Sequence, residues 1–108
     1  MDRGLALIGM AKKAGLLAVG AEAVSKVARR GDVKLILTAT DASEASVRRA
    51  ESSAVTYGIK HVRVPYTMFE LGTTAGRGSP GTIGFLDKGL ADGFLKRLAD
   101  RDIKESDA

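Results

Sequence analysis

The stretch LLAVGAEAVSKVARRG, residues 16–31, determines the fold that we expect for the whole chain. A short apolar segment, Leu16–Val19, is typical of a strand, and it stops at Gly20. The residues after Gly20 have helical spacing, which places four apolar side chains on one face and Glu22 with three cations on the other. Because Gly20 has no Cβ and the start of a helix has unpaired N–H groups, an anion could bind there. An ordinary strand-to-helix turn with a solvated helix face explains the same residues.

The composition indicates one soluble domain. The chain has 108 residues, of which 44% are hydrophobic and 28% are charged, as in compact rather than disordered proteins. A net charge of +4 favours a polyanionic partner. There are no cysteines, so disulfides, thiolate metal sites and cysteine nucleophiles are excluded.

No apolar run approaches the roughly 20 residues that span a bilayer, and the apolar residues near the N-terminus are too few for a signal peptide. We therefore expect a cytoplasmic protein with no membrane contact. Aromatic residues make up only 5% of the chain, so stacking on many bases is not expected to dominate binding.

Apolar spacing and turn residues predict a helix followed by four strand–helix pairs. The predicted elements are a helix at 3–14, the strand at 16–19, the helix at 21–30, a strand at 33–39, a helix from 41–44 to 56, a strand at 61–64, a helix from 67 to 75, a strand at 82–86 and a helix from 87. This alternation favours an α/β domain with helices on both faces of a mixed sheet. We expect one domain over residues 1–100 and a charged, frayed tail over 101–108.

Local signals support these elements. The run Leu35–Leu37 is apolar throughout, as in a strand that is covered on both faces. Asp41 and Glu44 have the spacing of a capping box and are expected to start the third helix, in which Tyr57 should face inward with three smaller apolar residues. Thr67 and Glu70 form a regular capping box for the fourth helix.

The sequence offers no catalytic constellation. The only histidine, His61, is predicted on a half-exposed strand, and no serine stands in a G-x-S-x-G context. Gly76-Arg77-Gly78 follows a helix rather than a strand, so it is neither a P-loop nor a dinucleotide fingerprint. We therefore expect a protein that is not an enzyme and that has no catalytic residue, metal ligand or cofactor.

What remains is a basic surface. Lys26, Arg29 and Arg30 share one side of the helix that starts at Gly20, and Lys34 begins the following strand. The loop that carries Arg77 could lie near the same helix start if the order of the strands permits it. An i, i+4 ion pair between Glu22 and Lys26 is the alternative explanation of part of this pattern.

Several segments together resemble the ribosomal L7Ae/L30e family, and its small bacterial members of the YlxQ type most closely. The segments are Leu7–Gly15, Gly20–Lys26, Arg30–Gly31, Lys34–Leu37, Thr40–Ser43, Tyr57–Ile59 and Glu70–Gly76. The resemblance extends from Gly4 to about Leu98. It implies a three-layer α/β/α sandwich with a four-stranded mixed sheet, and a non-catalytic RNA-binding function.

The best-known members of that family bind RNA kink-turns with the start of the second helix and two neighbouring loops. Their Gly-x-Asn-Glu-x-x-Lys signature falls on Gly20 to Lys26, where Gly20 matches the glycine that RNA approaches and Lys26 the lysine that contacts it. Glu22 and Ala23 replace the two side chains that read the G·A pairs. The loop before the last strand is more cationic and polar than is usual in the family, so we expect more phosphate contact and less base readout.

The resemblance and the basic surface together define the expected RNA-binding residues: Gly20, Ala21, Glu22, Lys26, Arg30, Lys34, Asp41, Arg77, Gly78 and Ser79. The expected partner is a structured RNA, either ribosomal RNA or a kink-turn, with ribosome association and a monomeric protein. Two alternatives stay open, a protein-interaction or regulatory adaptor on the same fold and the RNA-recognition domain of a larger RNA-modifying protein.

Overall fold

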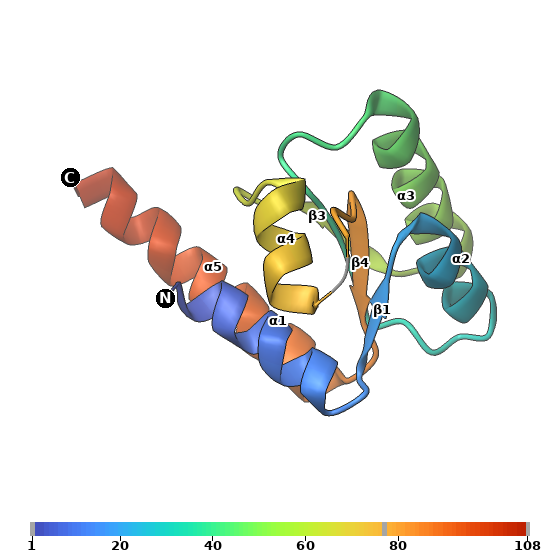
Figure 1. Cartoon of the computed structure of the whole chain (residues 1–108), viewed down its shortest axis with the longest axis horizontal. Helices are drawn as coiled ribbons and strands as arrows, with labels where there is room; N and C mark the ends of the chain where they lie inside the picture. Colours follow the sequence, from blue (N-terminus) through green and yellow to red (C-terminus); the bar gives the residue numbers. More distant parts are fainter. Residues whose placement is uncertain (1, 77, 108) are drawn as a thin grey trace.

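Helices and strands alternate along the chain (Figure 1). The computed structural model describes residues 2–76 and 78–107, with side chains up to Arg101. Its elements are α1 (Arg3–Lys13), β1 (Leu17–Val19), α2 (Ala21–Arg29), β2 (Leu35–Thr38), α3 (Glu44–Tyr57), β3 (Lys60–Arg63), α4 (Met68–Ala75), β4 (Thr82–Phe85) and α5 (Lys88–Asp107). Each predicted strand is present, and the boundaries of the strands differ from the prediction by one or two residues.

The four strands form one mixed sheet in the order β1-β4-β2-β3. β4 is antiparallel to both β1 and β2, whereas β2 and β3 are parallel and are joined by the crossover helix α3. Helices α1, α4 and α5 cover one face of the sheet, and α2 and α3 cover the other (Figure 1). The fold is therefore the expected three-layer α/β/α sandwich.

The core lies on both faces of the central strands. Successive side chains of β2 point to opposite faces, so Leu35 and Leu37 pack with α1, α4 and α5 while Ile36 packs with α2 and α3. All three are fully buried, as the continuous apolar run predicts. Phe85 of β4 and Phe94 of α5 meet with their ring centroids 5.4 Å apart and anchor the larger side of the core.

Two predictions about α3 are wrong. The helix begins at Glu44 with Ser43 as its N-cap, whose Oγ accepts a hydrogen bond from the N–H of Ser46 at 3.1 Å. Asp41 lies two residues too early to cap this helix. Tyr57 is 40% exposed, because it lies in the last turn of α3 and helical spacing does not show where the covering sheet ends.

The predicted starts of α4 and α5 are confirmed. Thr67 and Glu70 form the capping box of α4, and Asp87 Oδ2 accepts from the N–H of Leu90 at the start of α5. α5 extends from Lys88 to Asp107. Among the described residues, no helix is both long and apolar enough to cross a membrane.

Candidate nucleic-acid interface

The start of α2 is open and has no side-chain cap. Gly20 is the N-cap residue and has φ 99° and ψ 150°, a conformation that side-chain-bearing residues rarely adopt. A Cβ at this position would meet no atom within 4 Å, so the backbone faces open space. The first intrahelical bond joins the N–H of Val24 to the Gly20 carbonyl, which leaves the N–H groups of residues 21–23 directed out of the helix.

Two loops lie beside this helix start. The N–H of Gly20 donates to the carbonyl of Thr82, the first residue of β4, at 2.8 Å. On the other side of β4, the N–H of Ala39, directly after β2, donates to the carbonyl of Gly81 at 2.9 Å. The strand order therefore brings the α2 start, the α4–β4 loop and the β2–α3 loop to one end of the strands, which is the condition for the Arg77 loop to lie near the α2 start.

The α4–β4 loop is positioned by a glycine that the sequence analysis did not single out. A Cβ on Gly72 of α4 would overlap the carbonyl oxygen of Gly78 and come within 3.2 Å of Pro80 Cδ, so the loop lies directly against the helix backbone. Gly78 and Ser79 are exposed there. The signal for Gly72 is its place inside a helix, where glycine is otherwise unfavourable. Arg77 lies outside the described residues.

Asp41 holds the β2–α3 loop to α4. Its Oδ1 accepts a hydrogen bond from the N–H of Met68, the first residue of α4, at 2.8 Å. Asp41 is otherwise exposed. Asp41 therefore joins the β2–α3 loop to the start of α4 and does not cap α3.

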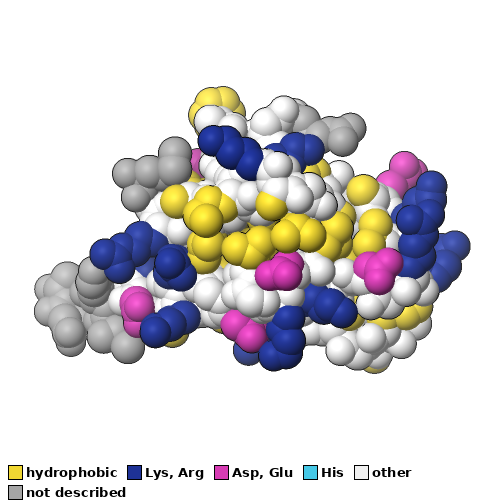
Figure 2. Space-filling view, turned by 90° about the horizontal axis from the view of Figure 1, so that it is seen from below, with side chains coloured by type: hydrophobic (Ala, Val, Ile, Leu, Met, Phe, Trp, Pro, Cys, Tyr) yellow, Lys and Arg dark blue, Asp and Glu magenta, His cyan; other side chains and the backbone are white. Residues whose placement is uncertain are grey.

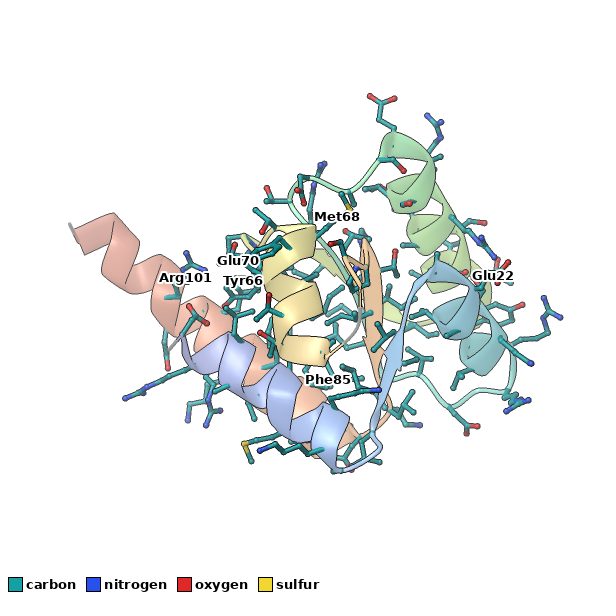
Figure 3. All side chains as sticks on the ribbon, in the orientation of Figure 1. Glu22, Tyr66, Met68, Glu70, Phe85 and Arg101 are labelled. Atoms are coloured by element: carbon teal, nitrogen blue, oxygen red, sulfur yellow. The ribbon has the colours of Figure 1, made fainter. Side chains whose placement is uncertain are left out.

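Lys26 is exposed on α2, about 9 Å along the helix axis from Gly20. The ion pair with Glu22, the alternative explanation of this pattern, is not present: neither side chain forms a salt bridge among the described residues. Figure 3 shows Glu22 on α2 and Met68 on α4, helices that cover opposite faces of the sheet. Lys26 is thus available to a ligand at the α2 start, and Glu22 places a negative charge beside the same N-terminus.

Two predicted site residues lie elsewhere. Arg30 follows the last turn of α2, about 15 Å from Gly20 along the axis. Lys34 N–H donates to the carbonyl of Phe85, so it lies at the far end of β4 from Thr82, about 13 Å away. Figure 2 shows the lower side of the molecule, where lysine and arginine side chains alternate with acidic ones around an apolar band. Arg30 and Lys34 therefore do not form one groove with Gly20.

Tyr66, in the loop before α4, contacts Arg101 of α5 (Figure 3), and both residues contact Asp2 at the start of α1. Tyr66 is almost fully buried, and the Arg101 guanidinium lies 5.3 Å from the centroid of its ring and 3.6 Å from Asp2 Oδ2. Burial and the hydrogen bond to Asp2 raise the pKa of Tyr66. Burial alone would raise the pKa of Asp2, but the hydrogen bonds it accepts, together with Arg101, lower it. At neutral pH, Tyr66 is therefore neutral and Asp2 is ionised.

His61 is a structural residue of the sheet. Its Nε2 lies 2.8 Å from Thr38 Oγ1 on the neighbouring strand, and burial lowers the pKa of its imidazole. The ring thus joins β2 and β3 through the hydroxyl of Thr38.

The family of the chain follows from a sequence comparison. The family model described as "Ribosomal protein L7Ae/L30e/S12e/Gadd45 family" matches residues 2–89. The chain belongs to this family. In this chain, Gly20, Gly81 and Ala39 lie at the end of the sheet at which the second helix starts.

Solved structures share the fold of this L7Ae/L30e/S12e/Gadd45 family member. One is a protein of unknown function from Bacillus halodurans C, 25% identical, with a TM-score of 0.83 over 92% of this chain and 99% of the other. Another is the 15.5kD RNA binding protein of Giardia lamblia, 16% identical, with a TM-score of 0.69 over 89% of this chain and 82% of the other. No curated protein matches the chain.

Proposed function

We propose that this protein is a non-catalytic RNA-binding protein that holds a structured RNA at the α2 start and the two loops beside it. The observation that carries the proposal is the open, uncapped start of α2 at Gly20, with Lys26 exposed less than two turns along the same helix and in no salt bridge among the described residues. Phosphate groups bind well at such helix N-termini, because backbone N–H groups and the helix dipole both favour an anion. Membership of a family named for ribosomal proteins, and the RNA-binding name of the Giardia lamblia protein, agree with it.

The proposed partner is a bent internal loop of RNA, of the kink-turn type or within ribosomal RNA, bound by a monomer in the cytoplasm. Glu22 and Ala23 limit how this RNA is read. Ala23 has no hydrogen-bonding side chain, and the carboxylate of Glu22 repels phosphate and accepts hydrogen bonds only. We therefore expect backbone contacts to supply most of the affinity and base contacts to supply little discrimination.

The test is a titration of the protein with a kink-turn RNA and with the same RNA lacking its tandem G·A pairs. Lys26→Ala is the test variant. Lys96→Ala, an exposed lysine of α5 on the opposite face of the sheet, is the matched control. We expect Lys26→Ala to weaken binding about 5- to 160-fold, equivalent to roughly 1–3 kcal/mol, and Lys96→Ala to leave it unchanged.

The outcomes separate the parts of the proposal. Tighter binding to the RNA with G·A pairs supports kink-turn recognition, and equal binding to both RNAs removes it while general RNA binding stands. Absence of binding to both RNAs and to bulk ribosomal RNA contradicts the proposed function as a whole.

A further inference from the structure

The strand β3 forms an open edge of the sheet. Among the strands of the described residues it pairs with β2 alone, over the register from Leu35 opposite Lys60 to Thr38 opposite Arg63. The N–H of Val64 donates to the Thr38 carbonyl, so alternation along the strand directs the N–H and C=O groups of Val62 and Lys60 toward β2. The N–H and C=O groups of His61 and Arg63 consequently point away from the sheet, where another strand could pair with them.

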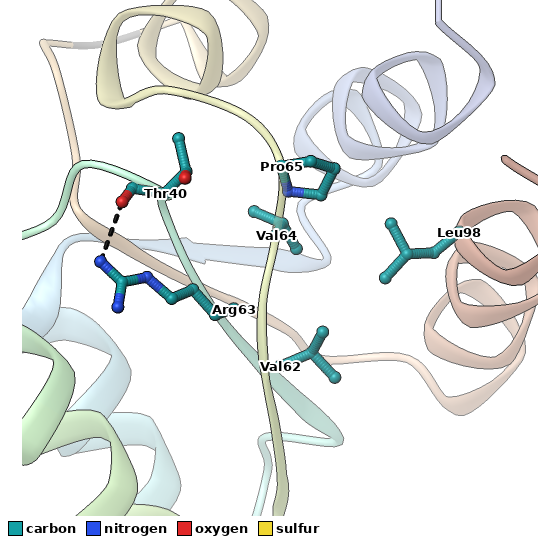
Figure 4. Close-up of a pocket in the computed structure, with 6 residues that line it drawn as sticks. All are labelled: Thr40, Val62, Arg63, Val64, Pro65 and Leu98. Atoms are coloured by element: carbon teal, nitrogen blue, oxygen red, sulfur yellow. Dashed lines mark hydrogen bonds between the residues drawn. The ribbon is translucent and has the colours of Figure 1, made fainter. Parts of the chain in front are cut away.

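A hollow lies on each side of this edge. On the α5 side, a space of about 380 Å³ is lined by the apolar side chains of Val62, Val64, Pro65 and Leu98, together with Thr40 and Arg63 (Figure 4). On the α3 side, a second hollow of about 320 Å³ is lined by Glu44, Val47, Arg48 and Arg63. The first hollow suits an aliphatic side chain, and the second favours an anionic one because its two arginines outnumber the single Glu44.

Arg63 is held in place between the two hollows. Its Nη2 donates to the carbonyl of Thr40 at 2.8 Å (Figure 4), while Val62 and Leu98 lie on the other side of the strand. This hydrogen bond uses one donor of a five-donor guanidinium, so further N–H groups face the exposed surface. Arg48 adds a second guanidinium, whose contact with Glu44 at 3.9 Å is long and largely exposed.

The charges on the edge indicate which strand it accepts. The ends of β3 are the cations Lys60 and Arg63, and the strand contains no acidic residue. A second copy pairing edge to edge would bring these cations together, which is unfavourable for directly opposed residues. A strand with acidic residues is favoured, because opposite charges on neighbouring strands attract.

We propose that the β3 edge binds an extended peptide segment of a partner protein in which aliphatic and acidic residues alternate. The segment adds a fifth strand to the sheet through the outward N–H and C=O groups of His61 and Arg63. Its aliphatic side chains enter the hollow beside Leu98, and its carboxylates meet Arg63 and Arg48. Strand addition of this kind takes affinity from the main chain and selectivity from pockets for alternate side chains. The site is separate from the proposed RNA interface.

The test uses a labelled peptide, Ser-Leu-Glu-Leu-Glu-Leu-Ser, with blocked ends. Its control has the same composition in the order Ser-Leu-Leu-Leu-Glu-Glu-Ser, which cannot place all aliphatic side chains on one face of a strand. We expect the alternating peptide to bind at least tenfold more tightly than the control. Because both probes act on the unmodified protein, a folding defect cannot explain the difference.

Protein variants and hydrogen exchange locate the binding. Arg63→Glu should weaken binding of the alternating peptide at least tenfold. Lys26→Ala, a variant in the proposed RNA site, should leave peptide binding unchanged, so failure of this proposal can be told from failure of the proposed RNA-binding function. The peptide should protect the amides of His61 and Arg63 from exchange and leave those of Lys60 and Val62, which already face β2, little altered. Equal binding of the two peptides, protection confined to other strands, or an effect of Arg63→Glu on RNA affinity alone would overturn the proposal.

Discussion

The hydroxyl of Tyr66 donates a hydrogen bond to Asp2 Oδ1 over 2.5 Å, and the two residues are 64 positions apart in the sequence. The same oxygen accepts hydrogen bonds from the N–H groups of Gly4 and Leu5, so Asp2 also caps α1. The carbonyl of Tyr66 in turn accepts from the N–H of Thr40. The start of α1 is thereby connected to the β2–α3 loop at the candidate interface.

Asp2→Asn should lower the free energy of unfolding by about 1–2 kcal/mol, because an amide forms weaker cap and side-chain hydrogen bonds than a carboxylate. Folding lowers the pKa of Asp2, so its contribution to stability is complete above the unfolded pKa of about 3.9 and is lost as the pH falls through the folded pKa. Thermal unfolding between pH 7 and pH 2.5 measures this. The difference in Tm between the natural protein and Asp2→Asn should shrink toward pH 2.5, and a constant difference would contradict it.

Gly20→Ala should destabilise the protein by about 1–3 kcal/mol, because φ 99° with ψ 150° is strained for any residue with a Cβ. It should also weaken RNA binding, since the new methyl group stands where the backbone is open. Gly31→Ala is the matched control, as Gly31 has φ 82° and open surroundings but lies at the opposite end of α2. We expect Gly31→Ala to lower Tm without changing RNA affinity, and equal effects of both variants on affinity would argue against contact at Gly20.

Gly72→Ala should displace the α4–β4 loop, because the added methyl group overlaps the backbone of Gly78. We expect the free energy of unfolding to fall by about 1–3 kcal/mol, as is typical of overpacking. RNA binding should weaken, while the NMR signals of the backbone amides at the α2 start stay unchanged. Gly9→Ala is the control within a helix, since its methyl group would meet Thr74 Cγ2 at an ordinary 3.5 Å. That variant should be stabilised by about 0.5–1 kcal/mol through helix propensity. An unchanged Tm for Gly72→Ala would show that the loop does not pack as described.

RNA affinity should fall as salt rises, because each neutralised phosphate releases counterions. The slope of log affinity against log salt should decrease in magnitude by about 0.7–0.9 in Lys26→Ala, equivalent to one phosphate contact. Lys34→Ala should leave the slope unchanged, since Lys34 lies at the other end of the sheet. If the slope decreased for Lys34→Ala and not for Lys26→Ala, the result would place the RNA-binding site at the Lys34 end of the sheet.

The sequence predicted the features that depend on neighbouring residues. The apolar run Leu35–Leu37 and the capping box at Thr67 each follow from local spacing. The α/β class followed from the alternation of these elements, and the resemblance to a family added the layers.

Features that depend on strand order were beyond the sequence. Lys34 looked close to the α2 start because it follows α2 in the chain, yet it lies beside Phe85, at the opposite end of β4 from Gly20. Asp41 and Ser43 are both suitable N-caps, and only the tertiary contact with Met68 assigns Asp41 to another helix. The position of Arg63 between two hollows likewise requires β3 to be the outer strand.

The hydrogen bond from Arg63 to the Thr40 carbonyl has a consequence for regulation. Thr40 belongs to the loop beside the proposed RNA site, and Arg63 belongs to the edge that would receive a peptide. A ligand that shifts either residue changes the energy of the other, and thermodynamic linkage makes that effect equal in both directions. If RNA and the proposed β3 peptide favour different positions of this contact, each changes the affinity of the protein for the other by the same factor.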